Sequence, residues 1–303
     1  MDNLKWIELR IQTTYEAQDA IFHILNEAGI SGIAIEDLTK QEQSMSMYPT
    51  DSIYIKAYMQ DEQLTKEKLE LLQEDVQQIS RYGLDIGSGD IVCVEIDEEE
   101  WATSWEKYYK PIEISEQMII MPTWEDQESV DEGMIVIELN PGLAFGTGSH
   151  ATTALCLRAL ETYVKPNDVI IDVGCGSGIL SIASLLLGAD HVIAIDNDTV
   201  AINSTRDNAK LNDVTNKLTV KQSNLLTSIQ QKKAHIIVAN IFAEVIMTFI
   251  DDAWTRLQPD GLFITSGIIE RKRDSVVKEL QHVGFHVIDI QQEDGWVCII
   301  AKK

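Results

Sequence analysis

The residues best placed to do chemistry follow a short apolar segment, residues 169–173, in the second half of the chain. Three glycines at alternate positions, Gly174, Gly176 and Gly178, come directly after it, and apolar residues with helical spacing follow them. A strand, a glycine turn and a helix in this order form a site for a nucleotide-like ligand, because glycine lets the backbone approach the ligand closely. A glycine turn without a ligand is the weaker reading of three alternate glycines after a buried strand.

The glycine spacing and a neighbouring acid indicate which ligand this site takes. A dinucleotide site needs the pattern G-x-G-x-x-G, but Ile179 stands where the third glycine would be. Asp172 directly precedes the first glycine. This variant resembles the first motif of S-adenosylmethionine-dependent methyltransferases, in which no pyrophosphate has to be seated on the helix end. We therefore expect Asp172, Gly174, Gly176 and Gly178 to belong to a cofactor site.

Two further polar residues come at the ends of predicted strands. Asp196 ends the strand at 191–195, about 20 residues past the glycines, where an acid can hold the hydroxyls of a ribose. Asn240 follows the strand at 235–239, at the carboxyl edge where open α/β sheets bind ligands. Both side chains are candidates for contact with the same ligand.

The elements that position these residues alternate between strands and helices over 112–303, which predicts a Rossmann-like α/β domain with seven strands. Apolar strands at 112–121 and 134–139 are expected to form a hairpin in front of it. The glycine-rich loop at 140–150 can lie against a ligand. The predicted strands of the sheet are 169–173, 191–195, 218–221, 235–239, 262–265, 285–290 and 296–301, and the predicted helices are 154–163, 179–187, 199–211, 241–257 and 270–283.

Residues 1–96 carry a different pattern, strand–helix–strand–strand–helix–strand, which is the order of a small ferredoxin-like α+β domain. Thr14 and Thr65 are its expected helix caps. This segment has no His–acid pair, nucleophile or metal spacing, so we interpret it as a substrate-recognition domain. Residues 97–111 begin with acids, end with lysines and carry an aromatic stripe, which predicts a linker helix that docks onto a domain.

Composition restricts the class of protein further. The net charge of −25 over 303 residues repels phosphate backbones and attracts basic partners, although solubility alone explains it equally well. We therefore expect no direct nucleic-acid substrate. No apolar run has the length of a membrane span, and the N-terminus carries no secretory signal. The four cysteines form no C-x-x-C pair, so we expect buried or site-lining thiols, no metal site and a cytoplasmic protein.

Four features of the chain coincide in one known family. They are the acidic ferredoxin-like front, W-A-T-S-W-E-K-Y-Y-K at 101–110, N-P-G-L-A-F-G-T-G-S-H at 140–150, and D-V-G-C-G-S-G-I-L at 172–180 with N-I-F-A at 240–243. Together they closely resemble the ribosomal protein L11 methyltransferase family, bacterial enzymes that methylate amino groups of that ribosomal protein. The glycine motif is general to methyltransferases, whereas the loop at 140–150 joined to it is highly specific.

The resemblance implies a protein-lysine N-methyltransferase that takes S-adenosyl-L-methionine and modifies lysine side chains or the N-terminal amine of a basic ribosomal protein. It places the cofactor contacts at Thr153, Gly174, Asp196 and Asn240, and we expect a monomer. The residues alone do not single out Thr153, for which helix capping is the other interpretation. The chain departs from the more common family pattern in two places: it has Ala151 where Pro is usual and Phe242 where Leu is usual. Both departures are mild, although Phe242 can shape the amine pocket differently.

The reaction that this family carries out needs mainly alignment, because the sulfonium is already activated. A lysine amine has an unperturbed pKa of about 10.4, so it must lose a proton before it attacks. The side-chain carbonyl of Asn240, the expected catalytic residue, can accept a hydrogen bond from the amine and orient its lone pair, but Asn cannot act as the base. The proton acceptor is either His150 or water, and a structural hydrogen bond is an equally good role for His150.

Four other functions compete with this one. An NAD-dependent oxidoreductase shares the strand, turn and helix but fails at Ile179. A methyltransferase of nucleic acid or glutamine usually has a proline pair after the Asn or Asp of the fourth strand, which Ile241 and Phe242 lack. A methyltransferase of another basic protein, and a non-catalytic ribosome-assembly protein that binds the cofactor, both remain open.

Overall fold

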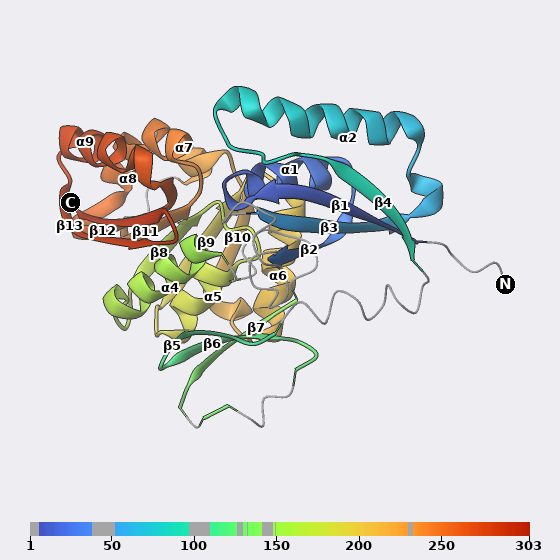
Figure 1. Ribbon diagram of the computed structural model, residues 1–303. Helices are drawn as coiled ribbons and strands as arrows, with labels where there is room; N and C mark the ends of the chain where they lie inside the picture. Colours follow the sequence, from blue (N-terminus) through green and yellow to red (C-terminus); the bar gives the residue numbers. More distant parts are fainter. Residues whose placement is uncertain are drawn as a thin grey trace. The chain divides into compact units, whose positions relative to one another are not determined.

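The chain divides into two compact units, Met1–Lys110 and Pro111–Lys303, and each unit has a sheet of its own (Figure 1). The helix predicted at 97–111 lies almost wholly outside the described residues, as does most of the loop at 140–150. The computed structural model describes residues 6–37, 52–96, 110–125, 130–131, 133–140, 148, 150–229 and 233–303.

The described residues of the first unit form a four-stranded antiparallel sheet in the order β2-β3-β1-β4. Ile7, Leu9 and Ile11 alternate along β1 and are buried, which is the period of a strand with one face on a core. The elements are β1 (Trp6–Thr14), the 3₁₀ turn η1 (Tyr15–Ala17), α1 (Gln18–Glu27), β2 (Ser31–Asp37), β3 (Ser52–Gln60), η2 (Asp61–Gln63), α2 (Lys66–Gln78), η3 (Ile79–Tyr82) and β4 (Ile91–Ile96).

The two expected helix caps of this unit behave differently. Thr65 caps α2, and its hydroxyl oxygen accepts a hydrogen bond from the backbone N–H of Lys68 at 3.2 Å, as predicted. The prediction for Thr14 was wrong, because β1 stays paired with β3 as far as Thr14 and α1 begins only at Gln18. The Thr14 hydroxyl instead donates to the backbone carbonyl of Asp85.

The second unit contains a seven-stranded sheet in its described residues, in the order β10-β9-β8-β11-β12-β14-β13. β14 is antiparallel to both of its neighbours, and the other paired strands are parallel. Its elements are β8 (Val169–Val173), β9 (His191–Asp196), β10 (Leu218–Gln222), β11 (Ala234–Asn240), β12 (Leu257–Ile269), β13 (His286–Glu293), β14 (Trp296–Lys302), α4 (Ala151–Tyr163), α5 (Ile179–Leu186), α6 (Thr199–Leu211), α7 (Ala243–Thr248), α8 (Ile250–Arg256), α9 (Arg273–Val283), and the 3₁₀ turns η6 (Thr215–Lys217), η7 (Leu225–Ser228) and η8 (Glu270–Lys272).

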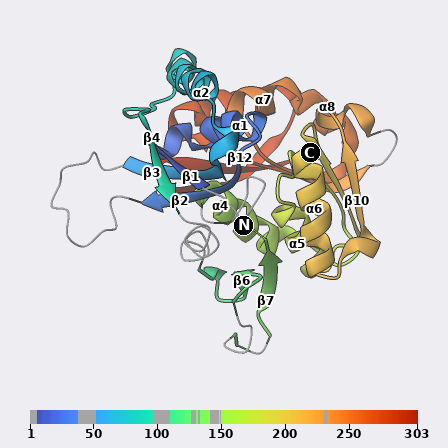
Figure 2. The ribbon, with the colours of Figure 1, turned by 90° about the vertical axis from the view of Figure 1, so that its right-hand side faces the viewer.

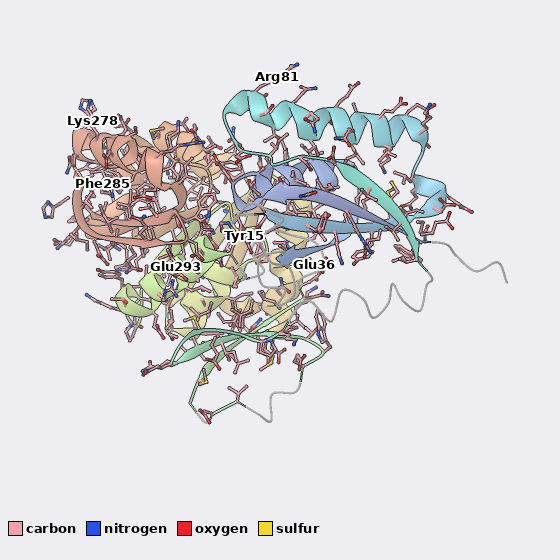
Figure 3. All side chains as sticks on the ribbon, in the orientation of Figure 1. Tyr15, Glu36, Arg81, Lys278, Phe285 and Glu293 are labelled. Carbon is pink, nitrogen blue, oxygen red and sulfur yellow. The ribbon has the colours of Figure 1, made fainter. Side chains whose placement is uncertain are left out.

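Both faces of this sheet are covered by helices, which explains why its strands are continuous apolar runs (Figures 1 and 2). Successive residues of β8 point to opposite faces. Ile170 joins a core with α4 and α5, and Ile171 joins a core with α7, α8 and α9. Phe285, labelled in Figure 3, belongs to the second core. Its ring packs edge-on against Trp254 at a centroid distance of 4.9 Å and lies 5.7 Å from that of Phe263.

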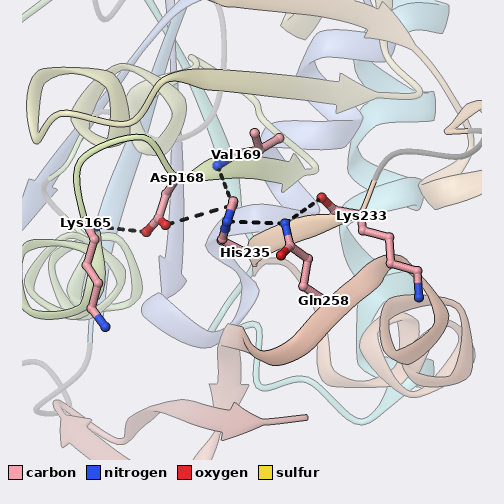
Figure 4. Close-up of polar contacts among 6 residues, drawn as sticks. All are labelled: Lys165, Asp168, Val169, Lys233, His235 and Gln258. Carbon is pink, nitrogen blue, oxygen red and sulfur yellow. Dashed lines mark hydrogen bonds and ion pairs between the residues drawn. The ribbon is translucent and has the colours of Figure 1, made fainter.

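The amino ends of the central strands β8 and β11 are tied by side chains (Figure 4). The Nδ1 atom of His235 accepts a hydrogen bond from the backbone N–H of Val169 at 2.9 Å, and the side-chain amide of Gln258 lies 3.2 Å from His235 Nε2. Asp168 accepts from the backbone N–H of Lys165 at 2.8 Å. This edge of the sheet therefore serves stability, and the opposite, carboxyl edge is left for ligands.

The hairpin predicted from the strands at 112–121 and 134–139 is wrong. The apolar run at 112–121 reverses at Glu116 and Gln117, both exposed, so that β5 (Ile112–Ser115) and β6 (Met118–Pro122) form an antiparallel hairpin by themselves. β7 (Ile135–Leu139) pairs with β6 in parallel. The connection between β6 and β7 is long enough for the crossover that a parallel pair requires.

Three smaller predictions also differ from the structure. The helix expected at 241–257 is two helices, because Phe249 has non-helical angles (φ −129°, ψ 15°) and turns its side chain into the core. The strand expected at 262–265 is longer, because β12 includes residues 259–261 as well. Cys93 is exposed, whereas the other three cysteines are buried as predicted. Among the described residues, no helix is long and apolar enough to cross a membrane.

Candidate functional site

The glycine turn joins β8 to α5 at the carboxyl edge of the sheet. Gly174, Gly176 and Gly178 have φ angles of 76°, 53° and 84°, a left-handed conformation that favours glycine. The backbone N–H groups of Gly174 and Cys175 both donate to the carbonyl of Ile195 in β9, at 2.8 and 3.0 Å. The turn is therefore held over the gap between the first two strands of the sheet.

Asp196 ends β9 and adds a further contact between this strand and the turn. Its Oδ2 atom accepts a hydrogen bond from the backbone N–H of Gly176 at 3.0 Å, and its Oδ1 atom accepts from Asp198 N at 3.0 Å. Burial raises the pKa of this carboxyl above its usual value, and the two backbone N–H groups counteract that shift. Each carboxylate oxygen keeps lone-pair capacity for a further donor, such as a ribose hydroxyl.

Asp172 lies in β8 beneath the turn and is fully buried. The hydroxyl of Ser181 in α5 donates to its Oδ2 atom at 2.7 Å, and its Oδ1 atom has no hydrogen-bond partner among the described residues. Burial raises the pKa of Asp172 to about 7, the nearby charge of Asp196 adds to the shift, and the Ser181 hydrogen bond opposes it. Any contact of Asp172 with a ligand would have to use the unpartnered oxygen.

Two glycines of the turn are also required by the protein's own packing. A Cβ atom on Gly174 would stand 2.5 Å from the Cγ2 atom of Ile241, and one on Gly178 would stand 2.8 Å from the Cγ2 atom of Thr205. The sequence explains these glycines by close approach of a ligand. The structure adds a second reason, which is the tight contact of β8 and α5 with residues far along the chain.

Asn240 and Thr153 are brought together across 87 residues of sequence. The side-chain Nδ2 atom of Asn240, at the end of β11, donates to the Thr153 hydroxyl in the first turn of α4 at 3.3 Å. Thr153 does not cap this helix, because the cap is His150, whose Nδ1 atom accepts from Thr152 N at 3.3 Å. With its nitrogen directed toward Thr153, the Asn240 amide has its carbonyl oxygen directed elsewhere.

His150 is built into the same corner as a structural residue. It is 5% exposed, its Nδ1 atom lies 2.7 Å from the Thr152 hydroxyl, and its ring packs edge-on against Trp296 with centroids 4.8 Å apart. Burial lowers the pKa of His150 to about 4. An imidazole with that pKa holds a proton poorly at neutral pH, so the surroundings of His150 favour the structural role over that of proton acceptor.

The helix α6, which was not predicted to belong to the site, holds both the turn and Asn140 at the start of the 140–150 loop. Asn208 of α6 donates to the Ser177 carbonyl at 2.9 Å, and its carbonyl oxygen accepts from Asn140 N at 3.0 Å. Asn212 exchanges two hydrogen bonds with the Glu138 backbone, and Thr205 donates to the Gly176 carbonyl at 2.9 Å. The polar side chains at 205, 208 and 212 recur every three or four residues on one helix face, a signal that was available in the sequence.

The sheet order, the left-handed glycine turn and the acid that ends β9 define the class of this protein. It is a Rossmann-like α/β protein, and the switch point between β8 and β11, where the strand order reverses, is the place at which such sheets bind ligands. The chain belongs to the ribosomal protein L11 methyltransferase (PrmA) family, which it matches over residues 5–303. The family resemblance seen in its four sequence features is thereby confirmed.

Sequence similarity to proteins of this family covers 99% of the chain. Ribosomal protein L11 methyltransferase of Oceanobacillus iheyensis is 46% identical over 312 aligned positions, which cover 99% of each protein. The Bacillus subtilis relative of the same name is 45% identical and is covered over 100% of its length. The crystal structure of ribosomal protein L11 methylase from Lactobacillus delbrueckii subsp. bulgaricus matches with a TM-score of 0.60 and 34% identity, over 64% of this chain and 98% of that one.

Proposed function

We propose that this protein transfers methyl groups from S-adenosylmethionine to amino groups of a ribosomal protein of the L11 type. The observation that carries the proposal is the similarity along 99% of the chain to proteins named ribosomal protein L11 methyltransferase. The site supports it, because the turn and the strand-end residues have the chemistry that a nucleoside-containing cofactor needs.

The residues of the carboxyl edge fit this cofactor. Asp196 offers carboxylate oxygens for the ribose hydroxyls, and the left-handed backbone at Gly174 and Gly176 permits close approach of a ligand. The unpartnered buried oxygen of Asp172 is a further acceptor below the turn. When bound, S-adenosylmethionine supplies a methyl group that is already activated for transfer.

Asn240 is the residue that we propose to act on the amine. Its side-chain nitrogen is engaged by Thr153, so its carbonyl oxygen is the atom available to accept a hydrogen bond from the substrate amine. This bond would aim the nitrogen lone pair and leave the amine to lose its proton to water, since burial lowers the pKa of His150 to about 4. The target amines are lysine side chains, the N-terminal amine or both.

We further propose that residues 1–96 are a ferredoxin-like recognition domain, that 97–111 link it to the catalytic domain, and that 112–303 bind the cofactor. The order of elements in the first unit and its antiparallel sheet support the first assignment. The net charge of −25 suits a basic protein substrate and disfavours direct binding of nucleic acid. The enzyme is proposed to act as a cytoplasmic monomer.

Mass spectrometry of the L11-type ribosomal protein after incubation with the enzyme and S-adenosylmethionine tests this function. We expect added masses in multiples of one methylene on peptides that carry lysine or the N-terminus. Calorimetric titration should detect binding of S-adenosylmethionine and not of NAD. A protein that binds S-adenosylmethionine and leaves the ribosomal protein unmodified would be the non-catalytic assembly factor or would act on another basic protein.

A further inference from the structure

The strand next to Asn240 contains a bulge that no sequence motif indicates. On β12, Thr265 pairs with Ile299 of β14 and Ile268 pairs with Val297, so β12 has one more residue than its partner. Gly267 lies in this bulge with φ of 80°. On its other edge β12 pairs with β11, where Ser266 lies opposite Asn240.

The bulge touches the peptide that follows Asn240. The backbone N–H of Ile241 donates to the Ser266 carbonyl at 3.2 Å. A Cβ atom on Gly267 would stand 2.4 Å from the carbonyl oxygen of Ile241, 2.8 Å from its carbonyl carbon and 3.0 Å from its nitrogen. These are backbone atoms, so any side chain at 267 would have to displace the chain directly after Asn240.

A second glycine confines Ile241 from the opposite strand. β11 lies between β8 and β12, and a Cβ atom on Gly174 after β8 would stand 2.5 Å from Ile241 Cγ2. Ile241 is thus held between two left-handed glycines, Gly174 against its side chain and Gly267 against its backbone. We name this arrangement of Gly174, Ile241, Ser266 and Gly267 the Ile241 seat.

We propose that Gly267 is a positioning residue for Asn240, because the bulge fixes the backbone at Ile241 and thereby the direction of the Asn240 side chain. The inference rests on the proposed function, in which the Asn240 carbonyl orients the amine. The side-chain nitrogen of Asn240 donates a hydrogen bond to Thr153. A shift of the backbone at Ile241 would therefore turn the side-chain carbonyl of Asn240 away from the substrate amine. A misplacement of roughly 1 Å at a reacting group can lower the rate about 10²-fold.

The test compares Gly267→Ala with Gly295→Ala in the full-length enzyme. Gly295, in the turn between β13 and β14, has φ of 78° and no atom within 4 Å of the position of a Cβ, so alanine there meets the same backbone strain without an overlap. We expect Gly267→Ala to lower kcat about tenfold to a hundredfold and to change the Kd for S-adenosylmethionine less than about threefold. Gly295→Ala should keep a normal kcat. Equal kcat values for the two variants would overturn the proposal.

A double-mutant cycle asks whether Gly267 acts through Asn240. In an Asn240→Ala background the Asn240 carbonyl is already lost, so adding Gly267→Ala should lower kcat less than about twofold further. The same fold-loss in the wild-type and Asn240→Ala backgrounds would mean that Gly267 serves the fold in general, and the positioning role would be withdrawn.

A measurement without substrate separates this inference from the proposed function. The side-chain amide resonances of Asn240, identified by their loss in Asn240→Ala, should shift in Gly267→Ala and stay in place in Gly295→Ala. Their constancy in both variants would overturn the inference, even if the wild-type enzyme methylates the ribosomal protein. An inactive wild type would remove the proposed function, and the resonances would still decide whether Gly267 positions Asn240.

A second pair of variants serves if Gly267→Ala does not fold. Ile241→Ala removes the side chain that contacts Gly174, and Val277→Ala shortens a residue that is also half-buried against the same core. We expect the Asn240 amide resonances to move in the first variant and to remain in the second. Unmoved resonances in Ile241→Ala would overturn the proposed seat.

Discussion

At the scale of single residues, the surroundings of a side chain decide its role. Asp172 and Asp196 are both acids next to the glycine turn. Asp196 accepts hydrogen bonds from two backbone N–H groups, whereas Asp172 accepts one from a hydroxyl group. Of these two acids, only Asp172 has a fully buried oxygen without a hydrogen-bond partner in the described part of the chain. Asp196 is therefore suited to accept hydrogen bonds from a ribose, and Asp172, besides its free acceptor atom, makes a pH-dependent contribution to stability.

The contribution of Asp172 to stability should fall as pH rises. Its pKa in the folded protein is about 7, above the unfolded value of about 3.9, so the folded state binds the proton more tightly. The resulting stability is complete below about pH 4 and is lost as pH rises through about 7. Asp172→Asn, which cannot ionise, should gain stability relative to wild type by up to about 4 kcal/mol between pH 4 and pH 8.

Urea unfolding of both proteins at pH 4 and pH 8 measures this difference. Comparison of the two proteins cancels the other titrating groups that they share. Curves of stability against pH that run parallel for Asp172→Asn and wild type would show that Asp172 ionises near its ordinary pKa despite its burial.

The catalytic role of Asn240 is tested by its removal. Asn240→Ala should lower kcat and kcat/KM together, because the carbonyl is proposed to bind the amine most strongly near the transition state. Asn240→Asp retains an acceptor, so it should keep substantial activity. If Asn240 only ties the end of β11 to Thr153, the melting temperature will fall while the remaining folded enzyme methylates at a normal rate.

At the scale of elements, α6 is the support on which the turn and the adjacent loop depend. Asn208 is 1% exposed and bonds both Ser177 and Asn140, so its loss leaves two backbone groups without their partner. Thr205 holds Gly176 from the same helix face. The position of the turn is therefore set by α6 as well as by the strand β8 and the helix α5 that it joins.

Asn208→Ala should destabilise the second unit by about 1–3 kcal/mol, the range for a buried hydrogen-bonding group left unsatisfied. It should also weaken binding of S-adenosylmethionine, since the turn loses a support. Asn203→Ala, on the exposed face of the same helix, is the matched control and should change neither property. Urea unfolding and calorimetric titration give both values, and similar behaviour of the two variants would exclude α6 from the support of the site.

At the scale of the whole molecule, the two compact units suggest a division of labour. A fragment that begins at Glu113 contains nearly all of the second unit. It includes all seven strands of the sheet β10-β9-β8-β11-β12-β14-β13. We expect it to fold, to bind S-adenosylmethionine with an affinity near that of the full chain, and to methylate the ribosomal protein poorly. Circular dichroism, calorimetry and a methylation assay test the three statements, and full activity of the fragment would contradict the recognition role of the first unit.

The sequence by itself determined the elements, the motifs and the family of this protein. Strand 169–173, the glycine turn and the acid at 196 follow one another locally, so hydrophobic period and glycine spacing were enough to find them. The errors at Thr14 and Phe249 share one cause, which is that pairing or packing with distant residues extended a strand or broke a helix. The error at 112–121 is local, because the apolar run hides a reversal at Glu116 and Gln117.

The tertiary structure alone decided how the site residues meet. Thr153 and Asn240 are 87 residues apart, and their hydrogen bond depends on where α4 crosses the end of β11. Gly267 carries no motif in the sequence, because its importance lies in the backbone of Ile241 on the neighbouring strand. Local patterns report the period and the turns of a chain. Strand order and register bring distant residues to one edge, and through burial they set the pKa values of Asp172 and His150.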